Sequence, residues 1–277
     1  MERADDHTIA GLKEKLITAN GILDMEGLIR PQGHISVRIP GTDTFLITRA
    51  IAPGMATIDD IVVVNALDAK VISGKYSSTF GEVLAHAAIY QKREDINSVA
   101  HTHSLYVRVL SMTETPLLPV SFEIMKVSYE PEKIGFYKEI WHLSNVHPKA
   151  CFDVADLLGE NRVVILKAHG AMIATKSIEE TTAVAINLEE AAKLQVMAGS
   201  LKPLVPFTEK EKEQQVSFLK PLEERGGTAS VYGRAWEYYK FLLSKNSLSL
   251  TDRHRARGTL ATYAPDSVIS SSQKDSL

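Results

Sequence analysis

Hydrophobic residues recur along the chain with two different periods, which predicts a protein that alternates helices with strands. Between residues 8 and 26, four apolar residues recur at spacings of three and four, as on one face of a helix. Short runs rich in Val, Ile and Thr, bounded by turn residues, predict strands at 34–39, 44–48, 61–64, 98–102, 162–166 and 171–174. Further helices are predicted at 80–92, 104–112, 177–199, 208–219 and 229–243. This alternation indicates an α/β fold.

Composition narrows the kind of protein. The chain has 277 residues, with 31 Lys and Arg against 34 Asp and Glu, so a nucleic-acid partner is not expected. No stretch approaches the roughly 18 consecutive apolar residues of a membrane span, and the acidic N-terminal segment does not resemble a secretory signal. We therefore expect a cytoplasmic protein without membrane association. The single cysteine, Cys151, leaves His, Asp and Glu as candidate metal ligands.

His101 and His103 are the first candidates for chemistry, because they end a predicted apolar strand. In an extended chain, residues i and i+2 project to the same face. Both imidazoles can therefore reach one metal ion at the usual ~2.0–2.1 Å. Two hydrogen-bonded histidines at the end of a strand are the alternative interpretation.

Two further candidates lie at the boundaries of predicted elements. His169 follows the strand 162–166, where open α/β sheets place ligands, and Gly170 permits a close backbone approach. An ordinary turn histidine is the alternative. Glu82 lies at the start of the helix 80–92, with His86 one turn later on the same face. This carboxylate either complements the helix dipole or, beside a bound metal, acts as a general acid/base.

Together, these residues resemble the class II aldolase/adducin family. The resemblance covers about residues 8–200 and rests on GEVLAHAAIYQKREDINSVAHTHSLYVRVLS, GHISVR at 33–38, FLIT at 45–48 and LKAHGAMIA at 166–174. It implies a three-layer α/β/α fold with a mainly antiparallel sheet, and a homotetramer with active sites between subunits. It also implies that His101, His103 and His169 bind one divalent ion (Zn, Mn or Fe), and that Glu82 is the catalytic acid/base.

Three positions depart from the phosphosugar aldolases of that family. Where those enzymes carry small amide or hydroxyl residues, this chain has His34, Arg49 and Phe80. A phosphosugar substrate is therefore not expected. Phe80 suits the face of a flat ring, and Arg49 suits a bidentate carboxylate contact. The alternatives are a solvated charge for Arg49 and a strand-start hydrogen bond for His34, which is otherwise a second candidate for proton transfer or for binding the leaving carboxylate.

The GHISVR pattern resembles a family branch that handles unphosphorylated carboxylates. That branch contains metal-dependent decarboxylases and the non-haem iron oxygenases of aminocoumarin pathways. The resemblance predicts a metal-dependent carbon–carbon lyase, most directly a decarboxylase or retro-aldolase of a hydroxylated aromatic or related carboxylic acid. An Fe(II)-dependent oxygenase and a non-catalytic adducin-like scaffold are the alternatives.

The chain is expected to have three parts. Residues 1–205 form the class II aldolase/adducin-like catalytic domain, 206–245 form a C-terminal helical extension, and the Ser-rich and Arg-rich segment 246–277 is expected to be disordered. The extension carries four aromatic residues, which are Tyr232, Trp236, Tyr238 and Tyr239. These residues form either a packing face or a wall of a neighbouring subunit's active site.

Overall fold

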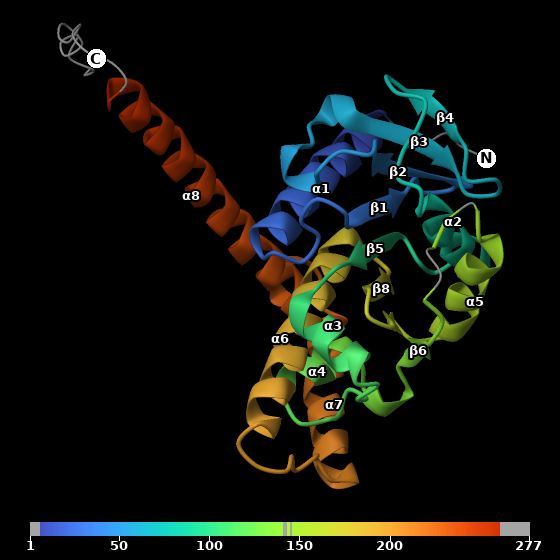
Figure 1. Cartoon of the computed structure of the whole chain (residues 1–277), viewed down its shortest axis with the longest axis vertical. Helices are drawn as coiled ribbons and strands as arrows, with labels where there is room; N and C mark the ends of the chain where they lie inside the picture. Colours follow the sequence, from blue (N-terminus) through green and yellow to red (C-terminus); the bar gives the residue numbers. More distant parts are fainter. Residues whose placement is uncertain (1–5, 141–142, 145, 261–277) are drawn as a thin grey trace, which may run out of the picture. The chain divides into compact units, whose positions relative to one another are not determined.

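One eight-stranded sheet forms the centre of the protein in a computed structural model of the chain, which describes residues 6–140, 143–144 and 146–260 (Figure 1). The strand order is β4-β3-β2-β1-β5-β8-β7-β6, and β6 and β7 form the one parallel pair among these neighbours. The strands are β1 (His34–Arg38), β2 (Thr44–Thr48), β3 (Ile61–Asn65), β4 (Val71–Gly74), β5 (Ser98–Thr102), β6 (Gly135–Tyr137), β7 (Val163–Leu166) and β8 (Gly170–Thr175). The mainly antiparallel sheet confirms the predicted fold class.

Helices cover both faces of this sheet. The helices are α1 (Asp6–Met25), α2 (Val83–Lys92), α3 (Leu105–Met112), α4 (Phe122–Val127), α5 (Pro148–Leu158), α6 (Ile178–Gly199), α7 (Glu209–Glu223) and α8 (Val231–Leu260). Helices α2 and α5 pack on one face, whereas α1, α3 and α6 pack on the other (Figure 1). The three layers therefore follow the α/β/α arrangement expected from the sequence.

Strand β1 shows how the sheet separates these two layers. Ile35 and Val37 alternate with His34 and Ser36, so the two kinds of side chain point to opposite faces. All four are buried, and His34 and Ser36 contact α2. The polar face of β1 is therefore part of the protein interior.

The segment 113–150 contains four prolines, and the sequence left its elements unassigned. In the structure, two prolines begin elements: Pro131 starts a 3-10 turn and Pro148 lies in the first turn of α5. Proline fits these positions because the first amide groups of a helix have no intrahelical acceptor. Ser121 caps α4, and its side chain accepts a hydrogen bond from the Ile124 amide.

The C-terminal part of the chain is more helical than predicted. The chain divides into two compact units, residues 1–240 and 241–277. Helix α8 continues through residues 246–260, a segment that we expected to be disordered. No proline interrupts residues 231–260, and Leu, Ala, Arg and Lys are good helix formers. The remainder of the predicted tail, 261–277, lies outside the described residues.

Two of the four C-terminal aromatic residues pack within the first unit. Tyr232 and Trp236 are buried, whereas Tyr238 is exposed. The Tyr232 hydroxyl donates to the carbonyl of Lys126 and accepts a hydrogen bond from Arg162. A packing role therefore accounts for Tyr232 and Trp236.

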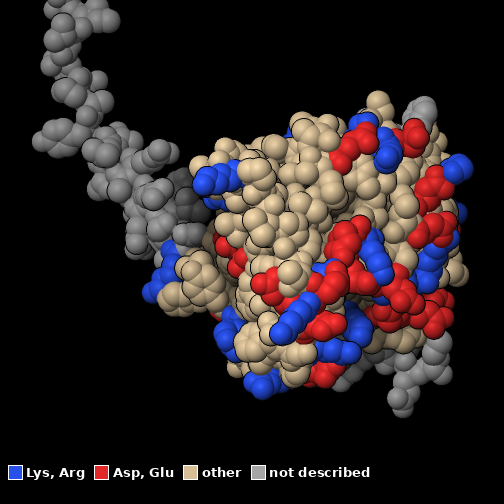
Figure 2. Space-filling model, turned by 90° about the horizontal axis from the view of Figure 1, so that it is seen from below, with Lys and Arg blue, Asp and Glu red and all other residues tan. Residues whose placement is uncertain are grey.

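The surface carries charges of both signs. In Figure 2, basic and acidic side chains lie beside one another over one part of the face, next to a broad area of other residues. Neighbouring charges of opposite sign weaken each other's electric field. Salt screens the remaining field beyond the ~8–10 Å Debye length. Over residues 6–140, 143–144 and 146–260, no helix combines the length and the apolar character needed to cross a membrane.

Candidate metal centre

Three histidines converge where β5 and β8 meet. His101 lies in β5, His103 follows that strand, and His169 lies in the turn between β7 and β8. The Nε2 atom of His101 lies 3.0 Å from Nε2 of His103 and 3.3 Å from Nε2 of His169. The antiparallel pairing of Thr102 with Ala171 brings the two chain segments together. The structure therefore places the three predicted ligands in one cluster, and the potential ligand atoms lie within 4.8 Å of one another.

This cluster fits a divalent cation. Nδ1 of His101 donates to the carbonyl of Ala171 at 3.2 Å, so the lone pair of the neutral ring lies on Nε2. Burial lowers the pKa of His101 well below its usual range and, with the charge of His169, that of His103 to about 4. Two nitrogens bound to one ion at ~2.0–2.1 Å lie roughly 2.9–3.4 Å apart for angles between 90° and tetrahedral. The observed nitrogen separations of 3.0 and 3.3 Å agree with this range.

Two glycines permit the close backbone approach at this cluster. Gly170 has a φ of 150°, and a Cβ atom there would overlap the carbonyl oxygen of Thr102. A Cβ atom on Gly33 would lie 2.7 Å from the carbonyl oxygen of His101. The glycine that follows His169 and the one that precedes His34 are therefore required by the packing of the strands that carry these histidines.

Glu82 faces the three histidines from the N-cap of α2. Its Oε1 atom lies 3.7 Å from Nε2 of both His101 and His169, and its Oε2 atom accepts a hydrogen bond from Nε2 of His34 at 3.1 Å. Burial alone would raise the pKa of Glu82, but the hydrogen bond from His34 and the neighbouring imidazoles lower it to about 2. The carboxylate is therefore ionised at neutral pH and can accept a proton.

His34, the second candidate for proton transfer, is fully buried beside Glu82. Its Nδ1 atom lies 2.8 Å from Nε2 of His86, and its ring lies 4.4 Å from that of Phe80, measured between centroids. The structure thus brings Phe80, Glu82 and His34 together at one end of α2.

Arg49 is engaged elsewhere. Its Nε atom donates to Oδ1 of Asp60 at 2.6 Å, and its guanidinium carbon lies 4.5 Å from the ring centroid of Tyr76. Asp60 and Tyr76 thus hold this side chain where β2 ends. A carboxylate-binding role for Arg49 stays a prediction, and a substrate would share the guanidinium with Asp60.

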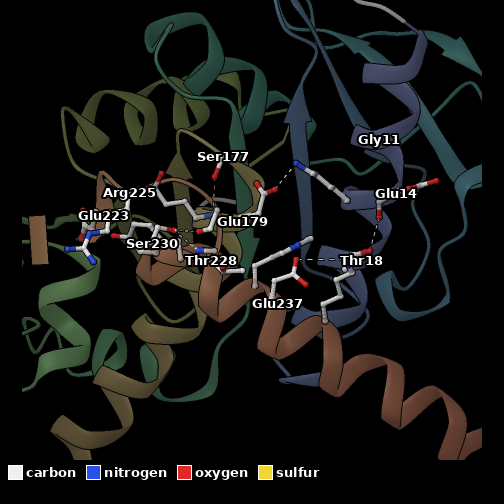
Figure 3. Close-up of a pocket in the computed structure, with 17 residues that line it drawn as sticks. Gly11, Glu14, Thr18, Ser177, Glu179, Glu223, Arg225, Thr228, Ser230 and Glu237 are labelled. Carbon is white, nitrogen blue, oxygen red and sulfur yellow. Dashed lines mark hydrogen bonds and ion pairs between the residues drawn. The ribbon is translucent and has the colours of Figure 1, made fainter. Parts of the chain in front are cut away.

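Two cavities differ in whether residues of the histidine cluster line them. A cavity of about 210 Å³ lies beside His169, and Tyr137, Leu143 and Lys167 also line it. A larger cavity of about 610 Å³ lies between α1, the start of α6, the first turns of α8 and the segment before α8 (Figure 3). Its lining carries charges of both signs, with Lys15 paired to Glu179 at 2.7 Å, and excludes the three histidines and Glu82. Of these two cavities, only the smaller one is lined by a residue of the candidate site.

The fold and the site together define an α/β protein with three histidines clustered at its sheet that could hold a metal ion. Residues 14–196 match the class II aldolase and adducin N-terminal domain family. The match covers more than half of the chain, and the chain belongs to this family. This confirms the family inferred from the histidine and glutamate motifs.

The relatives of this chain are named for different activities. The chain is 29% identical over 196 residues to Decarboxylase tropJ of Talaromyces stipitatus, which is 65% of this chain and 73% of that protein. It is 28% identical over 183 residues to L-fuculose phosphate aldolase of Methanococcus maripaludis, covering 65% of this chain and 93% of that protein. An aldolase II superfamily protein from Pseudomonas syringae superposes with a TM-score of 0.75 at 21% identity, over 87% of this chain and 95% of that one. That likeness supports the fold alone.

Proposed function

We propose that this protein is a metal-dependent carbon–carbon lyase, and most specifically a decarboxylase of an unphosphorylated hydroxylated aromatic or related carboxylic acid. The observation that carries the proposal is the convergence of the Nε2 atoms of His101, His103 and His169 opposite an ionised Glu82. Retro-aldol cleavage requires the same stabilisation of negative charge, since both reactions leave an electron pair on carbon when a carbon–carbon bond breaks.

The three histidines would hold one divalent ion, with Zn, Mn and Fe all suited to neutral nitrogen ligands. When bound, this ion supplies positive charge that stabilises the enolate or phenolate as the carbon–carbon bond breaks. The surrounding side chains provide the rest of the chemistry.

Glu82 would move the proton. As a carboxylate, it accepts the proton of the substrate hydroxyl and then returns that proton to the carbon from which carbon dioxide has left. Nε2 of His34 would donate a hydrogen bond to Glu82 or to the carboxylate that leaves, since this nitrogen is 3.1 Å from Glu82. The electron pair of the broken bond thus ends in a new carbon–hydrogen bond.

The residues around Glu82 support a flat, unphosphorylated substrate. The Phe80 ring lies against His34 at the entrance to α2 and offers an apolar face. Phe80 and His34 occupy two positions where the phosphosugar aldolases that this sequence resembles have small polar residues. The decarboxylase among the relatives supports decarboxylation as the reaction.

The direct test is a turnover assay of the full-length protein loaded separately with Zn²⁺ and Mn²⁺. We expect carbon dioxide release from at least one member of a panel of hydroxylated aromatic acids, and no cleavage of L-fuculose 1-phosphate. The matched control is Glu82→Gln, which keeps the shape of the side chain and removes the base. Release of carbon dioxide by this variant at the wild-type rate would contradict the proposed role of Glu82.

The same preparation separates the alternative functions. Oxygen uptake by the Fe(II)-loaded protein, with no carbon dioxide release by the other metal forms, would indicate an oxygenase. Absence of metal binding and of turnover would favour a non-catalytic scaffold related to adducin.

We further propose a cytoplasmic homotetramer with active sites between subunits. Helix α3 begins two residues after His103 and exposes Leu105, Val109 and Met112, which lie on one side of the helix. Such an apolar face close to the site is suited to contact with another subunit. Light scattering coupled to size-exclusion chromatography would give about four times the 30.5 kDa chain mass if the proposal holds.

A further inference from the structure

A continuous chain of hydrogen bonds runs from Glu82 into the protein interior. It passes from His34 Nδ1 to His86 Nε2 at 2.8 Å, from His86 Nδ1 to Ser36 Oγ at 2.7 Å, and from Ser36 Oγ to the Tyr90 hydroxyl at 2.8 Å. His34, Ser36 and His86 are fully buried, and Tyr90 is 2% exposed. The function proposed above uses only the first two members of this chain.

The chain follows from the repeats of one strand and one helix. His34 and Ser36 are two residues apart on β1, whereas Glu82, His86 and Tyr90 are four residues apart along α2. Two residues of a strand span about 6.8 Å, and four residues of a helix rise about 6 Å. The polar side chains of the two elements therefore interleave, and each strand residue lies between two helix residues.

The hydrogen-bond partners along the chain indicate where each proton lies. A carboxylate only accepts hydrogen bonds, so Nε2 of His34 donates to Glu82. When the ring carries this one proton, its Nδ1 is the acceptor in the contact with His86. Nε2 of His86 must then donate to His34. Burial lowers the pKa of His86 well below its usual range, so this ring is neutral and its Nδ1 accepts from Ser36. Burial also raises the pKa of Tyr90, which keeps its proton and donates it to Ser36.

We infer that His86 is a positioning residue which, held by Ser36 and Tyr90, fixes His34 in the tautomer that presents its Nε2 proton to Glu82. The chain ends at a buried phenol covered by Arg38, whose guanidinium carbon lies 4.6 Å from the ring centroid of Tyr90. The hydrogen-bonded chain therefore orients His34. Protons reach the substrate through Glu82. The catalytic part of this inference rests on the proposed lyase function, whereas the tautomer assignment does not.

The tautomer is measured by NMR of the zinc-loaded full-length protein containing histidine labelled with ¹⁵N in the ring. We expect His34 and His86 both to carry the proton on Nε2. An Nδ1-protonated His34 in the wild-type protein would overturn the inference, whatever activity the protein has.

Two substitutions of His86 separate its two contacts. The Gln amide nitrogen in His86→Gln takes the place of Nε2 and can still donate to His34. The shorter Asn in His86→Asn takes the place of Nδ1, so it keeps the contact with Ser36 and loses the one with His34. We expect the Nε2-protonated form of His34 to persist in His86→Gln and to mix with the other tautomer in His86→Asn.

Turnover gives the second readout. We expect kcat to fall about 10–100-fold in His86→Asn with KM and zinc content unchanged, and to stay within about 3-fold of wild type in His86→Gln. Equal losses in the two variants would contradict the donor role. If His86→Asn does not fold, Ser36→Ala tests the next link and should also release the second tautomer of His34. If no substrate is turned over, the proposed function fails and the NMR result alone decides the inference.

Discussion

The histidines around Glu82 form two groups that differ in what their ring nitrogens contact. In the first group, Nε2 of His101 faces Nε2 of both His103 and His169, within 3.3 Å. In the second group, each nitrogen of His34 and His86 faces a different polar atom within one hydrogen-bonded chain. The same side chain thus offers converging ring nitrogens in one place and links of a hydrogen-bonded chain in the next.

The largest effect that separates the two groups is expected for His101→Ala. Loss of one of three ligands should abolish both metal binding and turnover, because two imidazoles alone hold a divalent ion weakly. Elemental mass spectrometry of this variant and of His86→Gln provides the comparison. Full metal occupancy in His101→Ala would remove His101 from the ligand set.

Glu82→Gln should separate binding from chemistry. The amide keeps the size of the side chain but cannot accept a proton, so we expect the metal to stay and kcat to fall by about 10²–10⁴-fold. Parallel measurement of metal content and turnover tests both parts. Loss of metal from Glu82→Gln would place this carboxylate with the ligands instead.

Gly170→Ala should disturb the first group through the backbone. A Cβ atom there overlaps the carbonyl oxygen of Thr102, and the φ of 150° is strained for alanine, at a cost of about 1–3 kcal/mol or more. We expect a lower melting temperature and weaker metal binding. Gly11→Ala is the matched control, because nothing lies within 4 Å of a Cβ at that position. Equal melting temperatures for the two variants would contradict this account of Gly170.

The smallest effect is expected when the C-terminal unit is removed. A chain that ends at Lys240 keeps the buried Tyr232 and Trp236 and should retain its metal and its melting temperature within a few degrees. Deletion of residues 229–277 removes both aromatic side chains and should destabilise the fold by about 3 kcal/mol or more. Thermal denaturation followed by circular dichroism compares the two, and an equally stable longer deletion would show that the two side chains add little.

Much of the candidate metal centre could be predicted because its histidines lie in short motifs. His101 and His103 are two residues apart at a strand end, and His169 is followed by the glycine that close strand packing requires. The buried chain was harder to predict. In β1, the alternation of His34 and Ser36 with Ile35 and Val37 is typical of a strand with one solvated face. Here the polar face is buried against α2.

A signal for the second group was nevertheless present in the sequence. Glu82, His86 and Tyr90 recur every four residues along an otherwise apolar helix, which places three polar groups on one buried side. The contact between Arg49 and Asp60 has no comparable pattern in the sequence. Asp60 lies eleven residues away from Arg49, and the contact depends on the pairing of β2 with β3. Long-range contacts of this kind are fixed only when the sheet is formed.

The metal content of the wild-type protein tests the central claim most directly. The full-length protein would be purified without oxygen or chelator and analysed by elemental mass spectrometry. The arrangement of His101, His103 and His169 predicts about one divalent ion per chain. Absence of any bound ion, even after incubation with Zn²⁺, Mn²⁺ and Fe²⁺, would contradict the assignment of this cluster as a metal centre and the lyase function built on it.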